Sequence, residues 1–162
     1  MKIGLIGAGR LGICLALLIE QEGYHVIASD VREDYIKDLQ NKKINSTEPQ
    51  VQELLEHSIN LEFTTDNLKV IRESDIIFTL VQTPSLEDGS YDVSAVWKVV
   101  EDIKQEMSSI ANYPKSFVVG CTTNPGDCDK FKDALPESVD VYYNPEFIAQ
   151  GSIIDDLRHA DM

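Results

Sequence analysis

The chain has 162 residues, and 28 acidic side chains against 14 basic ones give it a formal charge of −14 at pH 7. A hydrophobic share of 43% over this length predicts one globular domain with an ordinary core, and it excludes disorder throughout. So negative a charge disfavours nucleic acid and anionic membrane as partners. No apolar run reaches membrane-spanning length.

Cysteine usage indicates a reducing compartment. Cys14, Cys121 and Cys128 form no CxxC pair, so we expect no disulfide framework and no metal site. The first residues are too short and too rich in glycine for a signal peptide. A cytoplasmic protein is the simplest interpretation.

Apolar runs alternate with amphipathic stretches along the whole chain. The runs predict strands over residues 3–6, 25–29, 61–64, 76–81, 117–121 and 139–143. Helices are expected over 11–19 and 34–39, from Pro49 in a first turn through His57, from an Asp92 N-cap to Ile110, and after Gly126. This alternation predicts an α/β, Rossmann-type, doubly wound and mostly parallel sheet with helices on both faces, forming one domain over 1–162.

Ligands of such sheets bind at the carboxyl ends of the strands. The residues to watch therefore follow each predicted strand. They are residues 7–12, Asp30, 82–84, 121–126 and 144–151.

A GxGxxG motif follows the first predicted strand and opens a predicted helix, with glycines at Gly7, Gly9 and Gly12. The first glycine permits the tight turn, the second lets backbone approach a pyrophosphate, and the third lets helix and strand pack closely. The phosphates would lie on the helix N-terminus formed by Arg10 and Leu11. The motif predicts a dinucleotide site, although a similar turn occurs in folds that bind another nucleotide or none.

Asp30 stands at the end of the second predicted strand. A carboxylate there accepts hydrogen bonds from the adenosine ribose and repels a 2′-phosphate, which favours NAD over NADP as cofactor. Arg32, two residues on, keeps NADP open as the lesser alternative.

Later segments give the chain a more specific resemblance. They are 2–12, Glu48-Pro49 before Leu54-Leu55, 63–66, Thr83-Pro84, 88–90, and Asn144-Pro145-Glu146-Phe147 with Gly151 after it. In this order they resemble the NAD-binding N-terminal domain of the UDP-glucose/GDP-mannose 6-dehydrogenase family. The resemblance covers essentially the whole chain.

The resemblance implies an enzyme that oxidises the C6 alcohol of a nucleotide sugar to a carboxylate with two molecules of NAD. In the family a cysteine captures the intermediate aldehyde, and the resulting thioester is hydrolysed. A thiohemiacetal can give up the second hydride, which explains the need for a nucleophile.

The resemblance also assigns residue roles. Thr122 matches a threonine that positions substrate and water beside the cofactor, and Glu146 matches a general base or water-orienting group for hydrolysis. Thr83, with Pro84, matches the loop that lies along the cofactor. Together with Gly7, Gly9, Arg10, Leu11, Gly12 and Asp30, these are the expected site residues.

The chain departs from the family pattern at Gln82, at Gln150 and over residues 120–126, where the family commonly has Lys-Ser-Thr before Pro-Pro-Gly. Gln82 stands where a proline is common, Cys121 where a serine is common, and Gln150 where a second glutamate is usual. Cys121 is expected to pack as a small residue, although a nucleophilic role is an alternative. The loss of a charge at Gln150 bears on the hydrolysis step.

The nucleophilic cysteine and most of the sugar-nucleotide pocket of this family lie beyond the region matched here. We therefore expect an N-terminal fragment that binds NAD weakly, does not complete the reaction alone, and is a homodimer when full length. Two alternatives stay open: a 3-hydroxyacid or 6-phosphogluconate-like dehydrogenase, and a non-catalytic NAD-binding module.

Overall fold

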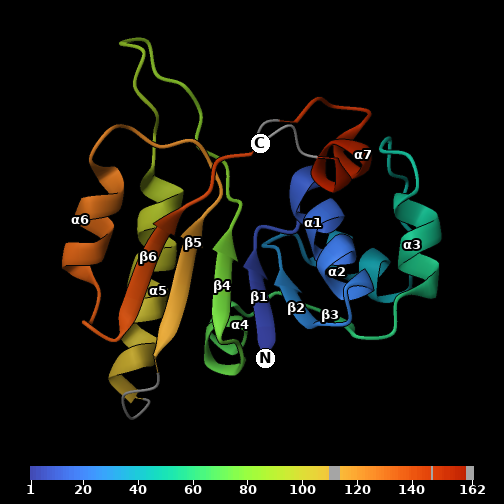
Figure 1. Cartoon of the computed structure of the whole chain (residues 1–162), viewed down its shortest axis with the longest axis horizontal. Coiled ribbons are helices and arrows are strands. Elements are labelled where there is room, and N and C mark those ends of the chain that lie inside the picture. The colour runs from blue at the N-terminus through green and yellow to red at the C-terminus, as the bar shows by residue number, and fades with distance from the viewer. Residues whose placement is uncertain (110–113, 147, 160–162) are drawn as a thin grey trace.

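The computed structural model describes residues 1–109, 114–146 and 148–159. Its centre is a six-stranded sheet, in which the strands lie in the order β3-β2-β1-β4-β5-β6 and every neighbouring pair is parallel (Figure 1). The strands are β1 (Lys2–Ile6), β2 (His25–Ser29), β3 (Leu61–Thr64), β4 (Ile76–Thr79), β5 (Lys115–Val119) and β6 (Val139–Tyr143). This confirms the predicted doubly wound Rossmann-type fold.

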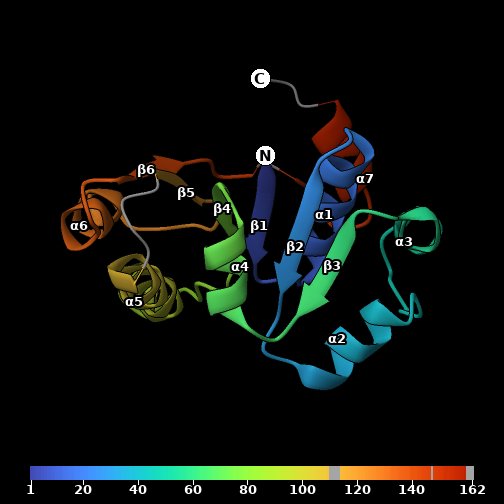
Figure 2. The same ribbon diagram turned by 90° about the horizontal axis from the view of Figure 1, so that it is seen from below.

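Seven helices in the described residues cover the sheet. They are α1 (Arg10–Gln21), α2 (Glu33–Gln40), α3 (Val51–His57), α4 (Asn67–Glu73), α5 (Ser94–Ser109), α6 (Asp127–Ala134) and α7 (Ile153–Arg158). Figure 2 shows helices on both sides of the strands, with α5 and α6 next to strands β5 and β6. Within these residues no helix is both long and apolar enough to cross a membrane.

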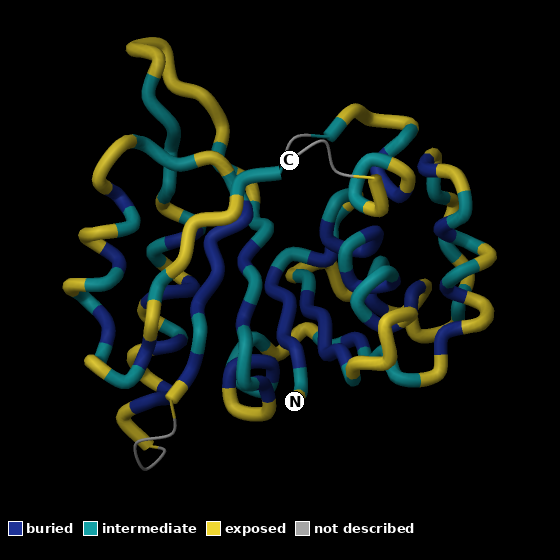
Figure 3. Tube along the Cα trace, in the orientation of Figure 1, coloured by how far each residue is buried: buried dark blue, intermediate teal, exposed yellow. Residues whose placement is uncertain are grey.

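Two apolar cores lie on opposite faces of the sheet. Leu5 packs in the core with α1, α2, α3 and α7, whereas its neighbour Ile6 packs in the core with α4, α5 and α6. Side chains alternate across a strand, so a continuous apolar run supplies both cores. Figure 3 shows the buried residues concentrated along the central strands.

Several predicted boundaries are confirmed. The strands β2, β3 and β6 begin and end at the predicted residues. Gly23 follows α1 with φ of +89°, the left-handed conformation that suits glycine after a helix.

At α5 the predicted N-cap is one residue early: Asp92 accepts from the Ser94 N–H at 2.9 Å, but the helix begins at Ser94 and the Val93 carbonyl accepts its first helical hydrogen bond. The predicted end of this helix, Ile110, lies outside the described residues.

Other boundaries were wrong. The helix predicted to contain Pro49 begins at Val51, because Gln50 has φ of +68° and stays outside it. The strand predicted over 76–81 ends at Thr79, and the one predicted over 117–121 runs from Lys115 to Val119. The sequence interpretation also missed α4, a short helix that Asp66 caps by accepting from the Lys69 N–H at 3.1 Å.

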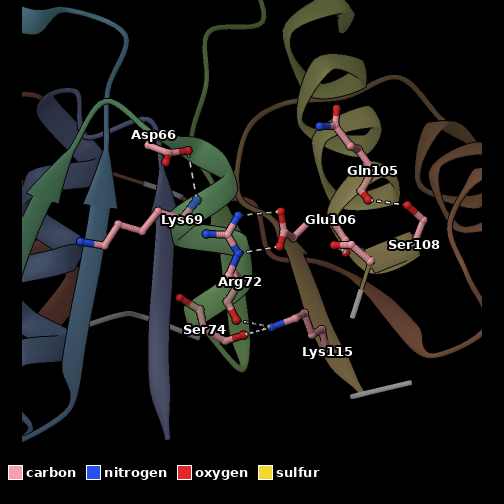
Figure 4. Close-up of polar contacts among 9 residues, drawn as sticks. Asp66, Lys69, Arg72, Ser74, Gln105, Glu106, Ser108 and Lys115 are labelled. Carbon is pink, nitrogen blue, oxygen red and sulfur yellow. Dashed lines mark hydrogen bonds and ion pairs between the residues drawn. The ribbon is translucent and has the colours of Figure 1, made fainter. Parts of the chain in front are cut away.

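A polar cluster ties α4 to α5 and β5 at the amino ends of the strands (Figure 4). Arg72 donates from Nε and Nη2 to the two carboxylate oxygens of Glu106, at 2.7 and 3.1 Å. The Glu106 side chain is 7% exposed and that of Arg72 54%. Lys115 donates to the carbonyl of Arg72, in the last turn of α4, and to that of Ser74, just after it, and burial lowers the pKa of its ammonium. This cluster lies at the end of the sheet opposite the predicted site.

The unequal burial of Arg72 and Glu106 predicts unequal losses on mutation. Arg72→Met leaves a buried carboxylate unpaired, so we expect it to cause the larger fall in the free energy of unfolding. Glu106→Gln leaves an exposed guanidinium that water can solvate, so its loss should be the smaller one. Urea unfolding of the two variants measures both values, and a larger loss in Glu106→Gln would contradict this account.

Candidate functional site

The turn between β1 and α1 depends on two glycines for its shape. Gly7 has φ of +101°, and its N–H donates to the Ser29 carbonyl at 2.9 Å. A Cβ on Gly7 would lie 2.7 Å from the carbonyl oxygen of Leu80, and one on Gly12 would overlap the carbonyl oxygen of Gly7. Helix α1 therefore approaches the turn as closely as a backbone without side chains allows.

Gly9 has a different role. Its φ of −64° suits any residue, and a Cβ built on it meets nothing within 4 Å. The space beside Gly9 opens onto the first turn of α1, where Arg10 and Leu11 begin the helix. Backbone N–H groups of a first helical turn lack intrahelical partners and attract phosphate. The fingerprint is thus folded as a pyrophosphate cradle requires.

Asp30 follows β2 and is held by a neighbour. Arg32 donates from Nε to Oδ1 and from Nη2 to Oδ2, both at 2.8 Å, and its backbone N–H donates to Oδ1 at 3.1 Å. Burial raises the pKa of the Asp30 carboxyl, but the hydrogen bonds from Arg32 outweigh it, so the pKa lies below its ordinary value. The Arg32 guanidinium also stacks 4.2 Å from the centroid of the Tyr35 ring. Asp30 is therefore an ionised carboxylate, screened by a cation.

A cleft of about 260 Å³ lies between the first turn of α1 and the loops after β4, β5 and β6. It brings together predicted residues that are far apart in the chain: Leu11, Thr83, Thr122 and Glu146. The remaining lining residues are Leu80, Val81, Gly120, Cys121, Pro145 and Ile148. One wall is apolar, and the polar groups come from the β4, β5 and β6 loops.

Glu146 is the titratable carboxyl of this cleft. Burial raises its pKa, although the Asn144 amide opposes the shift by donating to Glu146 Oε1 at 3.0 Å. A carboxyl with a raised pKa binds a proton more readily than one in water, as a general base requires. Phe147, the last residue of the motif, lies outside the described residues.

Cys121 also lines the cleft, but its chemistry differs from that of a nucleophile. Burial raises the pKa of its thiol to about 11. A thiolate is the reactive form, so this cysteine is protonated at neutral pH. The geometry favours the packing role for Cys121.

Two predicted site residues, Asp30 and Pro84, do not line the cleft. Asp30 lies on the far side of β1, and Pro84 is exposed. The carbonyl of Pro84 accepts from the Asp92 N–H at 2.9 Å, which closes the loop that carries Thr83. Gln82 is exposed.

Sequence reasoning missed two residues that shape these loops. Asn124 accepts from the Tyr91 N–H at 2.8 Å and donates to the Tyr91 carbonyl at 3.0 Å, which pins the β4 loop to the β5 loop. The buried carboxylate of Glu48 accepts from the Gly151 N–H. Asn124 lies in the range 121–126 that follows a predicted strand, and Glu48 lies in a segment that carries the family resemblance, but neither pattern reveals a partner so distant in sequence.

The contrast between Gly9 and Gly12 predicts that binding and folding can be separated. Gly9→Ala places its methyl group in open space, so we expect a change in unfolding free energy below about 0.5 kcal/mol. The same methyl would obstruct a pyrophosphate, so NAD affinity should fall at least about tenfold. Calorimetric titration with NAD and urea unfolding give the two values.

Gly12→Ala is the matched control, because its methyl meets the backbone of Gly7. We expect this variant to lose stability together with binding. Unchanged NAD affinity in folded Gly9→Ala would contradict the placement of the pyrophosphate.

Comparison with known proteins agrees with this geometry. Residues 1–162 match the model of the UDP-glucose/GDP-mannose dehydrogenase family, NAD binding domain. UDP-glucose 6-dehydrogenase TuaD from Bacillus subtilis is 30% identical over 170 residues, which cover 99% of this chain and 36% of TuaD. The crystal structure of GDP-mannose dehydrogenase from Pseudomonas aeruginosa superposes with a TM-score of 0.89 at 27% identity, covering 99% of this chain and 39% of that one.

A dehydrogenase of the alternative type is a more distant match. The 3-hydroxyisobutyrate dehydrogenase from Mycobacterium tuberculosis superposes with a TM-score of 0.63 at 13% identity, over 93% of this chain and 41% of that one, which shows a shared fold alone. The chain spans less than two fifths of the TuaD and GDP-mannose dehydrogenase sequences that it matches. With the family model matching throughout, the chain belongs to the UDP-glucose/GDP-mannose dehydrogenase family and corresponds to its NAD-binding domain.

Proposed function

We propose that the chain is the N-terminal, NAD-binding part of a cytoplasmic nucleotide-sugar 6-dehydrogenase that is a homodimer when complete. The observation that carries the proposal is the continuity of one sheet edge. The Gly7–Gly12 turn, Asp30 and the cleft with Thr122 and Glu146 follow neighbouring strands at their carboxyl ends. A dinucleotide laid along this edge would place adenosine near Asp30, pyrophosphate at Gly9, and nicotinamide at the cleft.

The residues present fit NAD. The space beside Gly9 is open, the first turn of α1 offers N–H groups, and Asp30 is an ionised acceptor for ribose hydroxyls. The Arg32 fork lies on the same carboxylate, but Oδ2 accepts a single hydrogen bond from it and keeps a lone pair for a ribose hydroxyl. When bound, NAD accepts the hydride.

In the proposed reaction a CH₂OH group becomes a carboxylate, with loss of two hydrides to two NAD and addition of the oxygen of one water. Thr122 orients the substrate and the water beside the nicotinamide. Glu146 takes a proton from the water that attacks the thioester, and its raised pKa favours that transfer. The nucleophile would be a cysteine outside residues 1–162, because burial raises the thiol pKa of all three cysteines here: Cys14 to about 12, Cys121 to about 11, and Cys128 above its ordinary value.

Asp30 supplies a direct test of the cofactor. We expect Asp30→Asn to weaken NAD binding about tenfold, because it removes charge-assisted hydrogen bonds to the ribose. It should also narrow the preference for NAD over NADP, since the 2′-phosphate would no longer meet a carboxylate. Calorimetry with both nucleotides measures the ratio.

Arg32→Gln is the matched variant for this test. It removes the cation and keeps the carboxylate, so the preference for NAD should widen. An unchanged ratio of NAD to NADP affinity in both variants would contradict the assignment of Asp30.

The raised pKa of Glu146 predicts how the rate of acid formation by the complete enzyme depends on pH. The carboxylate form of Glu146 is the base, and burial places its pKa above the ordinary value of 4.5. Formation of the acid product should therefore slow as the pH falls through this raised pKa. We expect Glu146→Gln to slow hydrolysis about 100-fold while the first hydride transfer persists, as a burst of NADH in stopped-flow absorbance.

Asn144→Ala is the control for the pH profile. It removes the hydrogen bond that lowers the Glu146 pKa, so the acid limb should move to higher pH with the plateau rate retained. An acid limb that is unchanged in Asn144→Ala, or full hydrolysis in Glu146→Gln, would exclude Glu146 as the base.

A further inference from the structure

A buried carboxylate fastens the loop that follows Glu146. Glu48 lies between α2 and α3 and is 4% exposed. Its Oε1 and Oε2 accept from the Gly151 N–H at 3.0 and 2.9 Å, and Oε2 also lies 3.4 Å from the Ile153 nitrogen. One side chain thus holds the end of this loop and the start of α7.

Arg10 reaches the same loop from the phosphate turn. Its Nη1 donates to Gln150 Oε1 at 2.7 Å, and its Nε lies 3.9 Å from Glu48 Oε1. Arg10 is the first residue of α1 and its side chain is 47% exposed. A guanidinium carries five N–H donors, so it can keep Gln150 and still offer a donor to a phosphate oxygen.

The loop joins this contact to the cleft. Glu146 and Ile148 line the cleft, and Gln150 and Gly151 lie only a few residues further along the chain. Figure 1 shows α7 beside α1. Gln150, which Arg10 contacts, therefore lies four positions along the chain from the carboxyl of the cleft.

Gln150 suits this role because it is neutral. A carboxylate at this position would pair with Arg10 and cancel its charge, whereas an amide accepts a hydrogen bond and leaves the positive charge available to an anion. Glu48 lies further from the guanidinium, and its oxygens are engaged by backbone N–H groups.

We propose that Arg10 couples dinucleotide binding to the loop of Glu146, with Glu48 as the positioning residue that anchors the far end of that loop. The inference rests on the proposed function, because the pyrophosphate of NAD is the anion that Arg10 would meet. With Arg10 engaged by both the pyrophosphate and Gln150, the far end of the loop is held by two adjacent contacts, one at Gln150 and one at Gly151. By linkage, whatever orders the loop also strengthens NAD binding.

Amide hydrogen exchange tests the coupling in the purified protein. At saturating NAD, exchange over residues 148–152 should slow at least about fivefold. Arg10→Met is measured at a higher NAD concentration, at which calorimetry shows that it is saturated. In this variant NAD should slow exchange over residues 148–152 less than about twofold. In Glu48→Gln without nucleotide, exchange at Gly151 should be about tenfold faster than in the wild type.

Arg158→Met is the matched control. Arg158 ties α7 to Gln50 and Gln21 at 2.7 and 2.8 Å without touching the phosphate turn. This variant should loosen α7 and keep the NAD-dependent slowing at residues 148–152. A merely structural role for Arg10 predicts the same response to NAD in both arginine variants.

The outcomes separate the two claims. If NAD slows amide exchange over residues 148–152 equally in the wild type and in Arg10→Met saturated with NAD, the coupling is wrong. The proposed function is unaffected by that result. Gly151 exchange unchanged in Glu48→Gln overturns the anchoring role. An absence of NAD binding to the wild type overturns the proposed function, and the coupling with it.

Discussion

The close approach of α1 to the turn after β1 is the constraint on which the site depends. Gly12 packs against the carbonyl of Gly7 with no room for a Cβ, and Gly7 in turn packs against the Leu80 carbonyl. This brings the N-terminus of α1 next to the ends of both β1 and β4. The open space at Gly9, the position of Arg10 and one wall of the cleft all follow from that packing.

The second organising feature is the use of side chains to tie separate loops together. Asn124 pins the β4 loop to the β5 loop, and Glu48 with Arg10 pins the β6 loop to the phosphate turn. Such bonds reach across 33 residues in the first case and 103 or more in the second. They give exposed loops a fixed position over the rigid sheet edge.

The two ends of the sheet differ in purpose. The Arg72–Glu106 pair and Lys115 at the amino ends stabilise the packing of α4, α5 and β5. At the carboxyl ends, the pKa values of two carboxyl groups are shifted in opposite directions: that of Asp30 is lowered and that of Glu146 is raised. A lowered pKa suits a carboxylate that accepts hydrogen bonds from ribose hydroxyls, and a raised pKa suits a carboxylate that takes up a proton.

Much of this architecture follows from the sequence alone. Periodicity and the GxGxxG spacing predicted the parallel sheet and the phosphate turn, because both depend on neighbours within a few residues. Short elements were harder. The helix α4 buries only Val70 and Ile71 and shows little periodicity, and the left-handed Gln50 that delays α3 has no sequence signal.

The sequence predicted which strand ends carry the site, but it did not predict the contacts between the side chains there. That Arg32 clamps Asp30, and that Glu48 reaches Gly151, depends on side-chain directions set by the folded backbone. Local patterns carry no information on such contacts. The roles of Thr122 and Glu146 came from family resemblance and stay predictions.

The most direct test of the central claim is an NMR titration of the ¹⁵N-labelled protein with NAD. The account predicts saturable shifts in the amides of residues 7–12, Asp30, Thr83 and Thr122, all at the carboxyl edge of the sheet. Amides at the opposite edge, such as Ser74 and Lys115, should stay in place. Saturable shifts confined to the amino edge, or none at any NAD concentration, would contradict it.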